Sequence, residues 1–358
     1  MPQSNVGFES FEEALIRCCY REFLRREPEQ AVIDSHLAPK VSGEEERSIA
    51  AVLQKFLASE EYQAQIAPDA ASNPGSLLPV TNVVKGTRES VEDSIRSRCM
   101  TSYLGNNTAL CRILGRYQLF VDTTDVGFSP HVMHRGVWEM PLTEWMVRNI
   151  TPGMRVLDIG GNFGYYSILM SDLVQHTGHC DVFEPNVLAA GLLKKSIAVN
   201  GFTDRARVFE IALSDVSGEA MQFYIPKDEP KNARLVEAFD EKLAERGRFV
   251  EVPVTTLDDM AHHIGKVDFI KIDAEGAEPG ILRGMMKTIR EDRPSMMVEI
   301  NCGRGYDARP LLDELWHIYG RLEYLGDDGH THLVGVEAVL NTKVGEDWLI
   351  HVQRPRSF

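Results

Sequence analysis

The chain has 358 residues, enough for about two domains, and its 43% apolar and 25% charged residues are ordinary for a globular protein. Its net charge of −15, from 53 acidic against 38 basic residues, argues against a general nucleic-acid binder, because such proteins present a basic surface. No signal peptide and no apolar run of about 18 residues is seen, so a cytoplasmic protein without a transmembrane segment is expected.

Residues 1–66 are predicted to form a small helical bundle. Capping-box patterns at residues 10–13 and 42–45 precede apolar residues at helical spacing, and Pro28 opens a short helix between them. This module resembles a short helical domain appended to bacterial glycan-modifying and surface-layer proteins. It is a candidate surface for self-association or for docking a partner protein.

Residues 67–95 have the composition of a linker, and residues 96–358 are predicted to form the second domain. A strand is expected through residues 116–122. Further strands are expected at 155–159, 180–184, 206–211, 267–273 and 296–300. Helical patterns separate them at 164–175, 187–200 and 277–290.

The alternation of short apolar strands with helices predicts an α/β fold, in which a mostly parallel sheet is covered on both faces. Segments 321–326 and 347–353 can close that sheet as a late hairpin. The expected sheet therefore has seven strands, one of them antiparallel.

The segment at residues 155–166, RVLDIGGNFGYY, is the most informative part of the chain. An apolar strand ends there in a glycine-rich turn, which lets the backbone approach a ligand closely. The turn does not fit the dinucleotide fingerprint G-x-G-x-x-G, since Asn162 and Tyr165 stand at its third and sixth positions. A nucleoside without a pyrophosphate is therefore expected, with S-adenosylmethionine as the obvious candidate.

The first expected contacts of this cofactor come from the turn itself. The turn, with Gly160, Asn162 and Gly164, would bring backbone amides close to the methionine carboxylate, helped by the N-terminus of the following helix. Asp158, at the strand end, is suited to accept hydrogen bonds from the ammonium group, directly or through water.

The next two strands are expected to supply the adenosine contacts. Glu184 can bridge the two ribose hydroxyls, and Asn186 is expected to cap the following helix. After the third strand, Ala212 would flank the adenine, and Ser214 or Asp215 could meet its amino group.

The fourth strand carries the expected catalytic carboxylates, Asp273 and Glu275. They would face the transferred methyl group and orient or partly deprotonate an acceptor hydroxyl. Together with Glu299 they could also hold a divalent ion, so metal dependence stays open. His134 is a further candidate base, because imidazole titrates near neutral pH.

Taken in order, these motifs resemble the FkbM family of S-adenosylmethionine-dependent methyltransferases. The resemblance spans about residues 115 to 300 and rests on segments 136–139, 158–166, 183–186, 212–215, 252–259 and 271–278. It implies a Rossmann-like class I methyltransferase fold and a role for Glu139 at the methionyl end of the cofactor. It also implies O-methylation of a hydroxyl, usually of a sugar in a glycan, polysaccharide or glycosylated metabolite. Gly161 stands where the family more often has alanine.

Two alternatives stay open. An NAD-dependent oxidoreductase shares the architecture, although the broken fingerprint and the fourth-strand carboxylates disfavour it. A scaffold with an inactive methyltransferase fold would use the helical module to recruit partners. The presence together of Asp158, Glu184, Asp273 and Glu275 speaks against it.

The charged insertion at residues 225–250 either shapes the acceptor pocket or is a solvated helix–loop excursion. The expected acceptor is a glycan or small molecule, not a nucleic acid.

Overall fold

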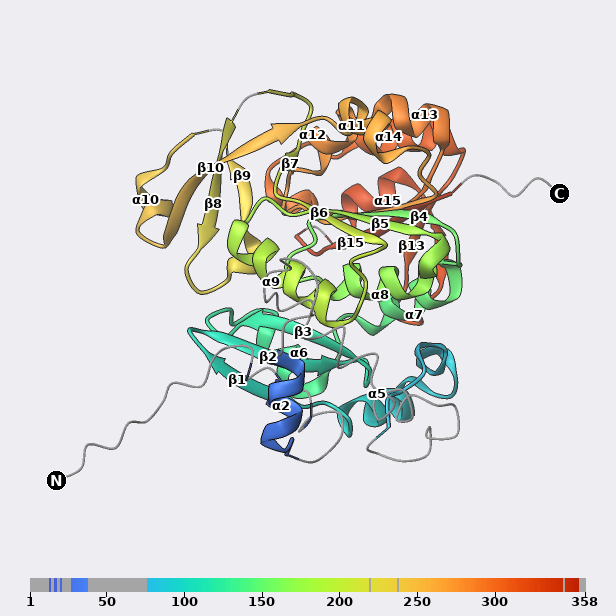
Figure 1. The fold of residues 1–358 in the computed structure, drawn as a ribbon. Coiled ribbons are helices and arrows are strands. Elements are labelled where there is room, and N and C mark those ends of the chain that lie inside the picture. The colour runs from blue at the N-terminus through green and yellow to red at the C-terminus, as the bar shows by residue number, and fades with distance from the viewer. Residues whose placement is uncertain are drawn as a thin grey trace.

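The computed structural model describes residues 13, 16–17, 20, 27–37, 76–218, 220–236, 238–343 and 345–353. Within these residues the strands form sheets of three, four and eight strands (Figure 1). No helix in this part of the chain is both long enough and apolar enough to cross a membrane.

The eight-stranded central sheet carries the candidate site. Its strands are, in spatial order, β14 (Thr331–Val334), β13 (Leu322–Leu325), β15 (Trp348–Val352), β12 (Ser295–Ile300), β11 (Phe269–Ile272), β4 (Arg155–Ile159), β5 (His179–Phe183) and β6 (Ala206–Phe209). The five strands from β12 to β6 run parallel, while β15 is antiparallel to both β12 and β13. The α/β fold with a mostly parallel sheet is thereby confirmed.

The strand count differs from the prediction of seven. Strand β14 pairs with β13 at the sheet edge and makes an eighth strand. Its sequence, THLV, contains the exposed His332 and Leu333 and lacks a run of apolar residues. An edge strand with so little buried surface gives almost no hydrophobic signal in the sequence.

Helices cover both faces of the central sheet (Figure 1). One layer consists of α7 (Met140–Asn149), α8 (Tyr165–Val174) and α9 (Val187–Val199). The other contains α11 (Leu257–Ile264), α12 (Glu278–Arg283), α13 (Met286–Asp292) and α14 (Arg309–Tyr319), with α15 (Val336–Asn341) near α14. Because side chains alternate along a strand, Val156 packs in the core under α8 and Leu157 in the core under α12.

The helix predicted at 277–290 is two helices, α12 and α13, that meet at Gly284. A Cβ atom at Gly284 would lie 1.9 Å from the carbonyl oxygen of Ser214. The backbone between the helices therefore packs directly on the loop that follows β7 (Ala212–Leu213). This close approach explains the break, which the helical pattern of the sequence does not show.

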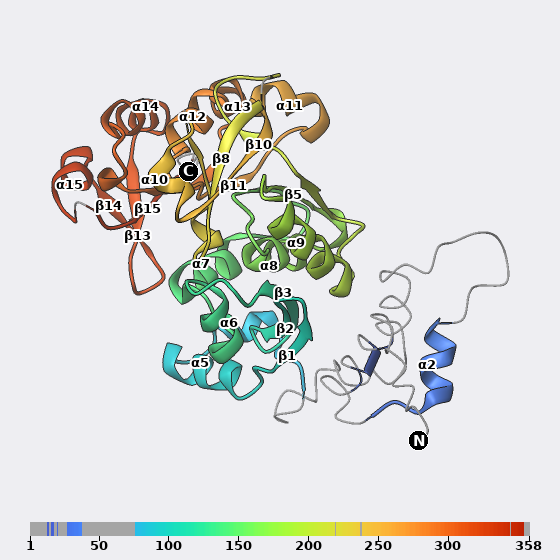
Figure 2. The ribbon, with the colours of Figure 1, turned by 90° about the vertical axis from the view of Figure 1, so that its left-hand side faces the viewer.

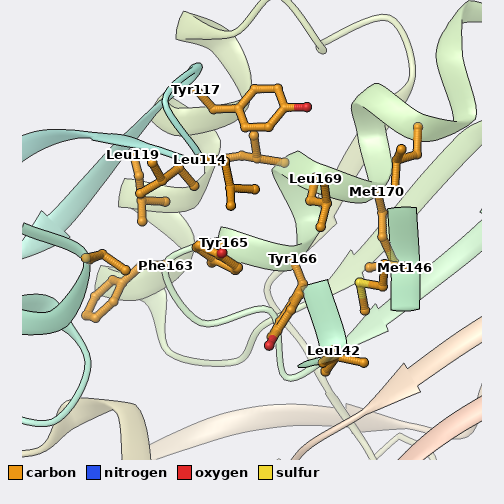
Figure 3. Close-up of a cluster of buried hydrophobic side chains, with 14 of the residues drawn as sticks. Leu114, Tyr117, Leu119, Leu142, Met146, Phe163, Tyr165, Tyr166, Leu169 and Met170 are labelled. Carbon is orange, nitrogen blue, oxygen red and sulfur yellow. The ribbon is translucent and has the colours of Figure 1, made fainter. Parts of the chain in front are cut away.

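A three-stranded antiparallel sheet lies outside α8 and α9 (Figure 2). It consists of β1 (Thr101–Gly105), β2 (Thr108–Ile113) and β3 (Tyr117–Asp122), of which only the last was predicted. Figure 3 shows Tyr117 and Leu119 of this sheet facing Tyr165 and Leu169 of α8. The short helix α6 (Ser129–Arg135) follows the sheet and leads into α7.

Part of the segment predicted as a linker is helical. Residues Val80–Val84 form a 3-10 helix and Arg88–Arg96 form α5. Buried Val83 and Ile95 belong to the same core cluster as β2 and β3. The domain boundaries at residues 66 and 95 stay predictions.

The helical N-terminal module is described only in part. Helix α2 (Gln30–Leu37) confirms the short helix expected after Pro28, and its Ile33 is buried. The helix expected after residue 45 and residues 67–75 of the predicted linker lie outside the described residues.

The charged insertion is mainly a β-sheet and not the helix–loop excursion considered from the sequence. Strands β8 (Ala220–Pro226), β9 (Arg234–Val236) and β10 (Gly247–Thr255) join β7 in a four-stranded sheet beside the central one (Figure 1). A 3-10 helix, Pro230–Asn232, connects β8 to β9, and the single-turn helix α10 (Glu241–Ala244) precedes β10. The segment from Pro230 to Leu235 reaches the candidate site.

Candidate active site

A cavity of about 780 Å³ lies at the carboxyl edge of the central sheet, where β4, β5 and β11 end. This volume is within the range of small-molecule binding sites. The structure brings nine of the predicted site residues to its wall: Glu139, Gly160, Asn162, Gly164, Glu184, Ala212, Asp273, Glu275 and Glu299. Three others, Asp158, Ser214 and His134, are not part of the wall.

The glycine-rich turn after β4 has the tight backbone that the sequence predicts. Gly160 and Gly164 have φ values of +83° and +99°, and Asn162 has φ +49°. A Cβ atom at Gly160 would lie 1.9 Å from the carbonyl oxygen of Asp273, so the turn packs directly on the end of β11. At Gly161, a Cβ atom would lie 2.3 Å from Val182 Cγ1, which suits glycine at this position.

Glu184 stands at the end of β5 and is held by two backbone amides. Its carboxylate accepts hydrogen bonds from Asn162 N at 2.7 Å and Asn186 N at 2.8 Å. Its exposed fraction is 6%, and this burial raises its pKa to about 7 although both hydrogen bonds oppose the shift. The Asn186 side chain accepts a hydrogen bond from Leu188 N and caps α9, as predicted.

Asp158 lies beneath the turn, where it faces Lys271. The two residues are register partners on β4 and β11, so their side chains leave the sheet on the same face. Lys271 Nζ lies 3.8 Å from Asp158 Oδ1 and 3.1 Å from Asp273 Oδ2. Asp158 also accepts a hydrogen bond from Ser167 Oγ at 2.6 Å, and its exposed fraction is 1%. Asp158 thus holds Lys271 in place at the cavity wall.

Charge compensation keeps Lys271 protonated despite its burial. Burial alone would lower the pKa of the ammonium, but Asp273 and Asp158 outweigh it and raise that pKa above its ordinary value. The ammonium also lies 5.1 Å from the ring centroid of Tyr166. Lys271 is consequently a fixed positive charge at the point where β4 and β11 end.

Glu139 occupies the first position before α7 and turns toward α8. Its φ is +39°, and its side chain does not cap the helix. Instead, its carboxylate accepts a hydrogen bond of 2.6 Å from Tyr166 Oη. This bond places Glu139 on the cavity wall close to the glycine-rich turn.

Arg304 joins the remaining acidic groups of the wall. Its guanidinium lies 2.9 Å from Glu275 and 2.7 Å from Glu299, and it also pairs with Asp347 at 3.3 Å. Burial, and then the charge of Asp273, raise the pKa of Glu275 to about 7, which Arg304 opposes. Burial likewise raises the pKa of Glu299.

The candidate metal ligands Asp273, Glu275 and Glu299 do not converge on a common point. The guanidinium of Arg304 pairs with two of them, so this chain supplies its own cation there. Among the described residues, no group of three or more histidine, cysteine, aspartate or glutamate side chains is arranged to hold a metal ion.

The predicted adenine end is apolar. Ala212 lines the cavity there, and so do Phe183, Ile211, Leu213 and Ile281. Ser214 points elsewhere, with its hydroxyl 3.3 Å from Asp215.

His134 is exposed on α6 and is not brought to the cavity with the other predicted residues. Trp138, from the same part of the chain, does line it.

Two walls of the cavity can be distinguished. The strand-edge wall comprises Glu184, Lys271, Asp273, Glu275 and the glycine-rich turn. The insertion wall comprises the residues from Pro230 to Leu235, including Lys231 and Arg234.

Sequence reasoning gave no role to Lys271 or Arg304, and it left open whether the charged insertion shapes the acceptor pocket. The spacing of Lys271 two residues before Asp273 on one strand could have revealed the first, because such residues share a face. Arg304 and the insertion wall reach the cavity through tertiary packing, and no local signal marks them.

A mostly parallel sheet with this strand order, and a nucleoside-sized cavity at its carboxyl edge, defines a Rossmann-like class I methyltransferase fold. The family model described as the methyltransferase FkbM domain matches residues 158–342, just over half of the chain. The chain therefore belongs to the FkbM methyltransferase family.

Individual relatives are distant. The methyltransferase sdnD of Sordaria araneosa is 24% identical over 165 residues, which cover 39% of this chain and 63% of that protein. The chain thus spans less than two thirds of the length of this relative. A crystal structure of methyltransferase FkbM from Methylobacillus flagellatus is 15% identical, with a TM-score of 0.34 over 56% of this chain and 43% of that one. The 16S rRNA methyltransferase RsmC of T. thermophilus, in complex with AdoMet and guanosine, is 14% identical, with a TM-score of 0.37. The match covers 71% of this chain and 52% of that one.

Proposed function

We propose that the protein is an S-adenosylmethionine-dependent O-methyltransferase that acts on a sugar hydroxyl of a glycan, a polysaccharide or a glycosylated metabolite. The observation that carries this proposal is the convergence of the glycine-rich turn, Glu184 and the Asp273–Glu275 segment on one cavity. The resemblance to the FkbM family implies that these motifs bind the methyl donor.

The residues present fit the proposed cofactor. Glu184 lines the cavity, where two backbone amides hold its carboxylate, and it can accept hydrogen bonds from the two ribose hydroxyls. The apolar surface from Phe183 to Ile281 suits an adenine ring. Glu139 and the glycine-rich turn line the same cavity, and we assign Glu139 to the ammonium and the amides of the turn to the carboxylate of the methionyl group. Asp158 would act through Lys271 and not by direct contact.

The residues also fit proton transfer from a hydroxyl. S-adenosylmethionine, when bound, supplies a methyl group that its sulfonium already activates. What the chain must add is positioning and a base. With a pKa of about 7, Glu275 is poised to take the hydroxyl proton as the oxygen–methyl bond forms, while Lys271 holds Asp273 beside it.

A transfer assay tests this proposal. S-adenosylmethionine carrying a ¹³C-methyl group is incubated with the protein and a glycan panel, and products are examined by mass spectrometry and NMR. The expected result is a new methyl ether on a sugar hydroxyl, with release of S-adenosylhomocysteine. Methyl transfer only to nitrogen or carbon would overturn the O-methylation. Tight NADH binding without S-adenosylhomocysteine binding would instead support the oxidoreductase alternative.

A further inference from the structure

Lys231, on the insertion wall, lines the cavity and forms no ion pair with any other described residue. Its ammonium lies 5.6 Å from the ring centroid of Trp138, and none of the described acidic residues lies within ion-pair distance of it. The side chain packs over Gly127, where a Cβ atom would lie 2.2 Å from Lys231 Cε. A backbone hydrogen bond of 3.0 Å, from Val126 N to the carbonyl oxygen of Asp228, joins the segment around Gly127 to the insertion.

Arg234, on the same wall, shows the same pattern. It is half-buried, its guanidinium carbon lies 5.2 Å from the ring centroid of Tyr224, and it too has no ion pair among the described residues. A guanidinium offers a planar fork of donors that matches a carboxylate or a phosphate.

The carboxylates across the cavity are already engaged. Glu275, Glu299 and Asp347 pair with Arg304, while Asp158 and Asp273 pair with Lys271. Glu139, the remaining acid near Lys231, accepts the Tyr166 hydroxyl hydrogen bond. The carboxylates that face the cavity thus have ion pairs or hydrogen bonds of their own. Lys231, whose charge lowers the pKa values of Glu139 and Glu275, and Arg234 form no ion pair with a described residue.

We infer that Lys231 and Arg234 bind a negatively charged group of the acceptor, a carboxylate or a phosphate, so that the acceptor is an acidic sugar. This inference rests on the proposed function, because it names the substrate class of the same cavity. Half-buried cations without a counter-ion lose hydration, and an anionic group restores the lost interactions through charge-assisted hydrogen bonds. A neutral sugar would leave both cations unpaired.

Ligand binding to the protein saturated with S-adenosylhomocysteine tests the inference. Glucose, glucuronate and glucose 6-phosphate are titrated at fixed ionic strength, with affinities measured by calorimetry and saturation-transfer NMR. At least one of the two acidic sugars is expected to bind tenfold or more tightly than glucose. The comparison of glucuronate with glucose 6-phosphate tells which anion is preferred.

Variants connect the preference to the two cations. Lys231→Met and Arg234→Met should each lower the affinity for the acidic sugar by about tenfold or more, since a charged hydrogen bond is lost. Lys242→Met, an exposed lysine of α10 outside the cavity wall, is the matched control and should change nothing. All three variants should keep the wild-type affinity for S-adenosylhomocysteine.

Each other outcome overturns the inference. Equal binding of glucose and the acidic sugars, or no binding of either acidic sugar, would show that the wall does not select an anion. A loss of S-adenosylhomocysteine binding in Lys231→Met would assign this lysine to the cofactor instead. Failure of the wild-type protein to bind S-adenosylhomocysteine would be distinct, because it would overturn the proposed function itself.

Discussion

The strand-edge wall and the insertion wall enclose the same cavity but differ in how their charges are balanced. Lys271 and Arg304 form short ion pairs with Asp273 and Glu275 of the strand-edge wall, and two backbone amides hold Glu184. Lys231 and Arg234 of the insertion wall contact aromatic rings and no described carboxylate. A wall whose charged side chains pair with one another is suited to hold a fixed geometry. A wall whose cations have no ion pair is suited to recognise a ligand that carries a negative charge.

The largest effect is expected where the strand-edge wall performs chemistry. Glu275→Gln should lower kcat by roughly 10²–10⁴-fold, because the amide cannot accept the hydroxyl proton. In the wild-type enzyme the carboxylate is the active form and its pKa is about 7, so kcat should rise with pH up to about 7 and then level off. Transfer rates measured between pH 5.5 and 8.5 check both points. An unchanged rate in the variant would remove Glu275 from catalysis.

Lys271→Met should destabilise the fold by about 3–5 kcal/mol, because it leaves Asp158 and Asp273 without their cation in a buried site. Lys266→Met, an exposed lysine five residues earlier in the chain, is the control and should cost little. Denaturant unfolding of both variants makes the comparison. Equal stabilities would contradict the view that internal compensation holds this wall together.

The packing of the glycine-rich turn can be separated from its backbone conformation. Gly160→Ala should destabilise the protein by roughly 1–3 kcal/mol more than Gly305→Ala. Both glycines have φ above +80°, but only at Gly160 would the new Cβ atom meet another backbone oxygen, whereas Gly305 has nothing within 4 Å. Thermal unfolding of the Gly160→Ala and Gly305→Ala variants measures the difference in stability. Equal losses would mean that φ alone, and not contact with Asp273, requires glycine at this turn.

The smallest effect concerns proton linkage at Glu184. Because the pKa of Glu184 is about 7, its carboxyl group must lose its proton before it can accept hydrogen bonds from both ribose hydroxyls. Affinity for S-adenosylhomocysteine should therefore fall as pH drops below 7, by at most tenfold per pH unit, and level off above it. Calorimetry in buffers of different ionisation enthalpy should detect proton release near neutral pH. Glu184→Gln should lack this pH dependence, and a wild-type affinity that is flat from pH 5.5 to 8 would argue against the linkage.

The strand-edge wall was largely predictable from the sequence. The carboxyl ends of neighbouring parallel strands meet at one sheet edge, so Gly160, Glu184 and Asp273 could be placed together from their motifs alone. Local chemistry also predicted that Asn186 caps α9.

What the sequence did not predict depends on long-range packing. Arg304 reaches Glu275 from beyond β12. The sequence left open whether the charged insertion shapes the pocket, and the insertion reaches the cavity because β8, β9 and β10 form a separate sheet. Asp158 was expected to meet the ligand, but its register with Lys271 directs it beneath the turn. His134 was expected at the site, but α6 leaves it exposed.

The central claim is that the glycine-rich turn and Glu184 form a site for the methyl donor. Calorimetric titration of the wild-type protein and of Glu184→Ala with S-adenosylhomocysteine tests it most directly. The account predicts one site per chain in the wild-type protein, and an affinity lower by about ten- to a hundredfold in the variant, as expected for the loss of hydrogen bonds to a charged group. No binding by the wild-type protein, or equal binding by a folded Glu184→Ala variant, would contradict it.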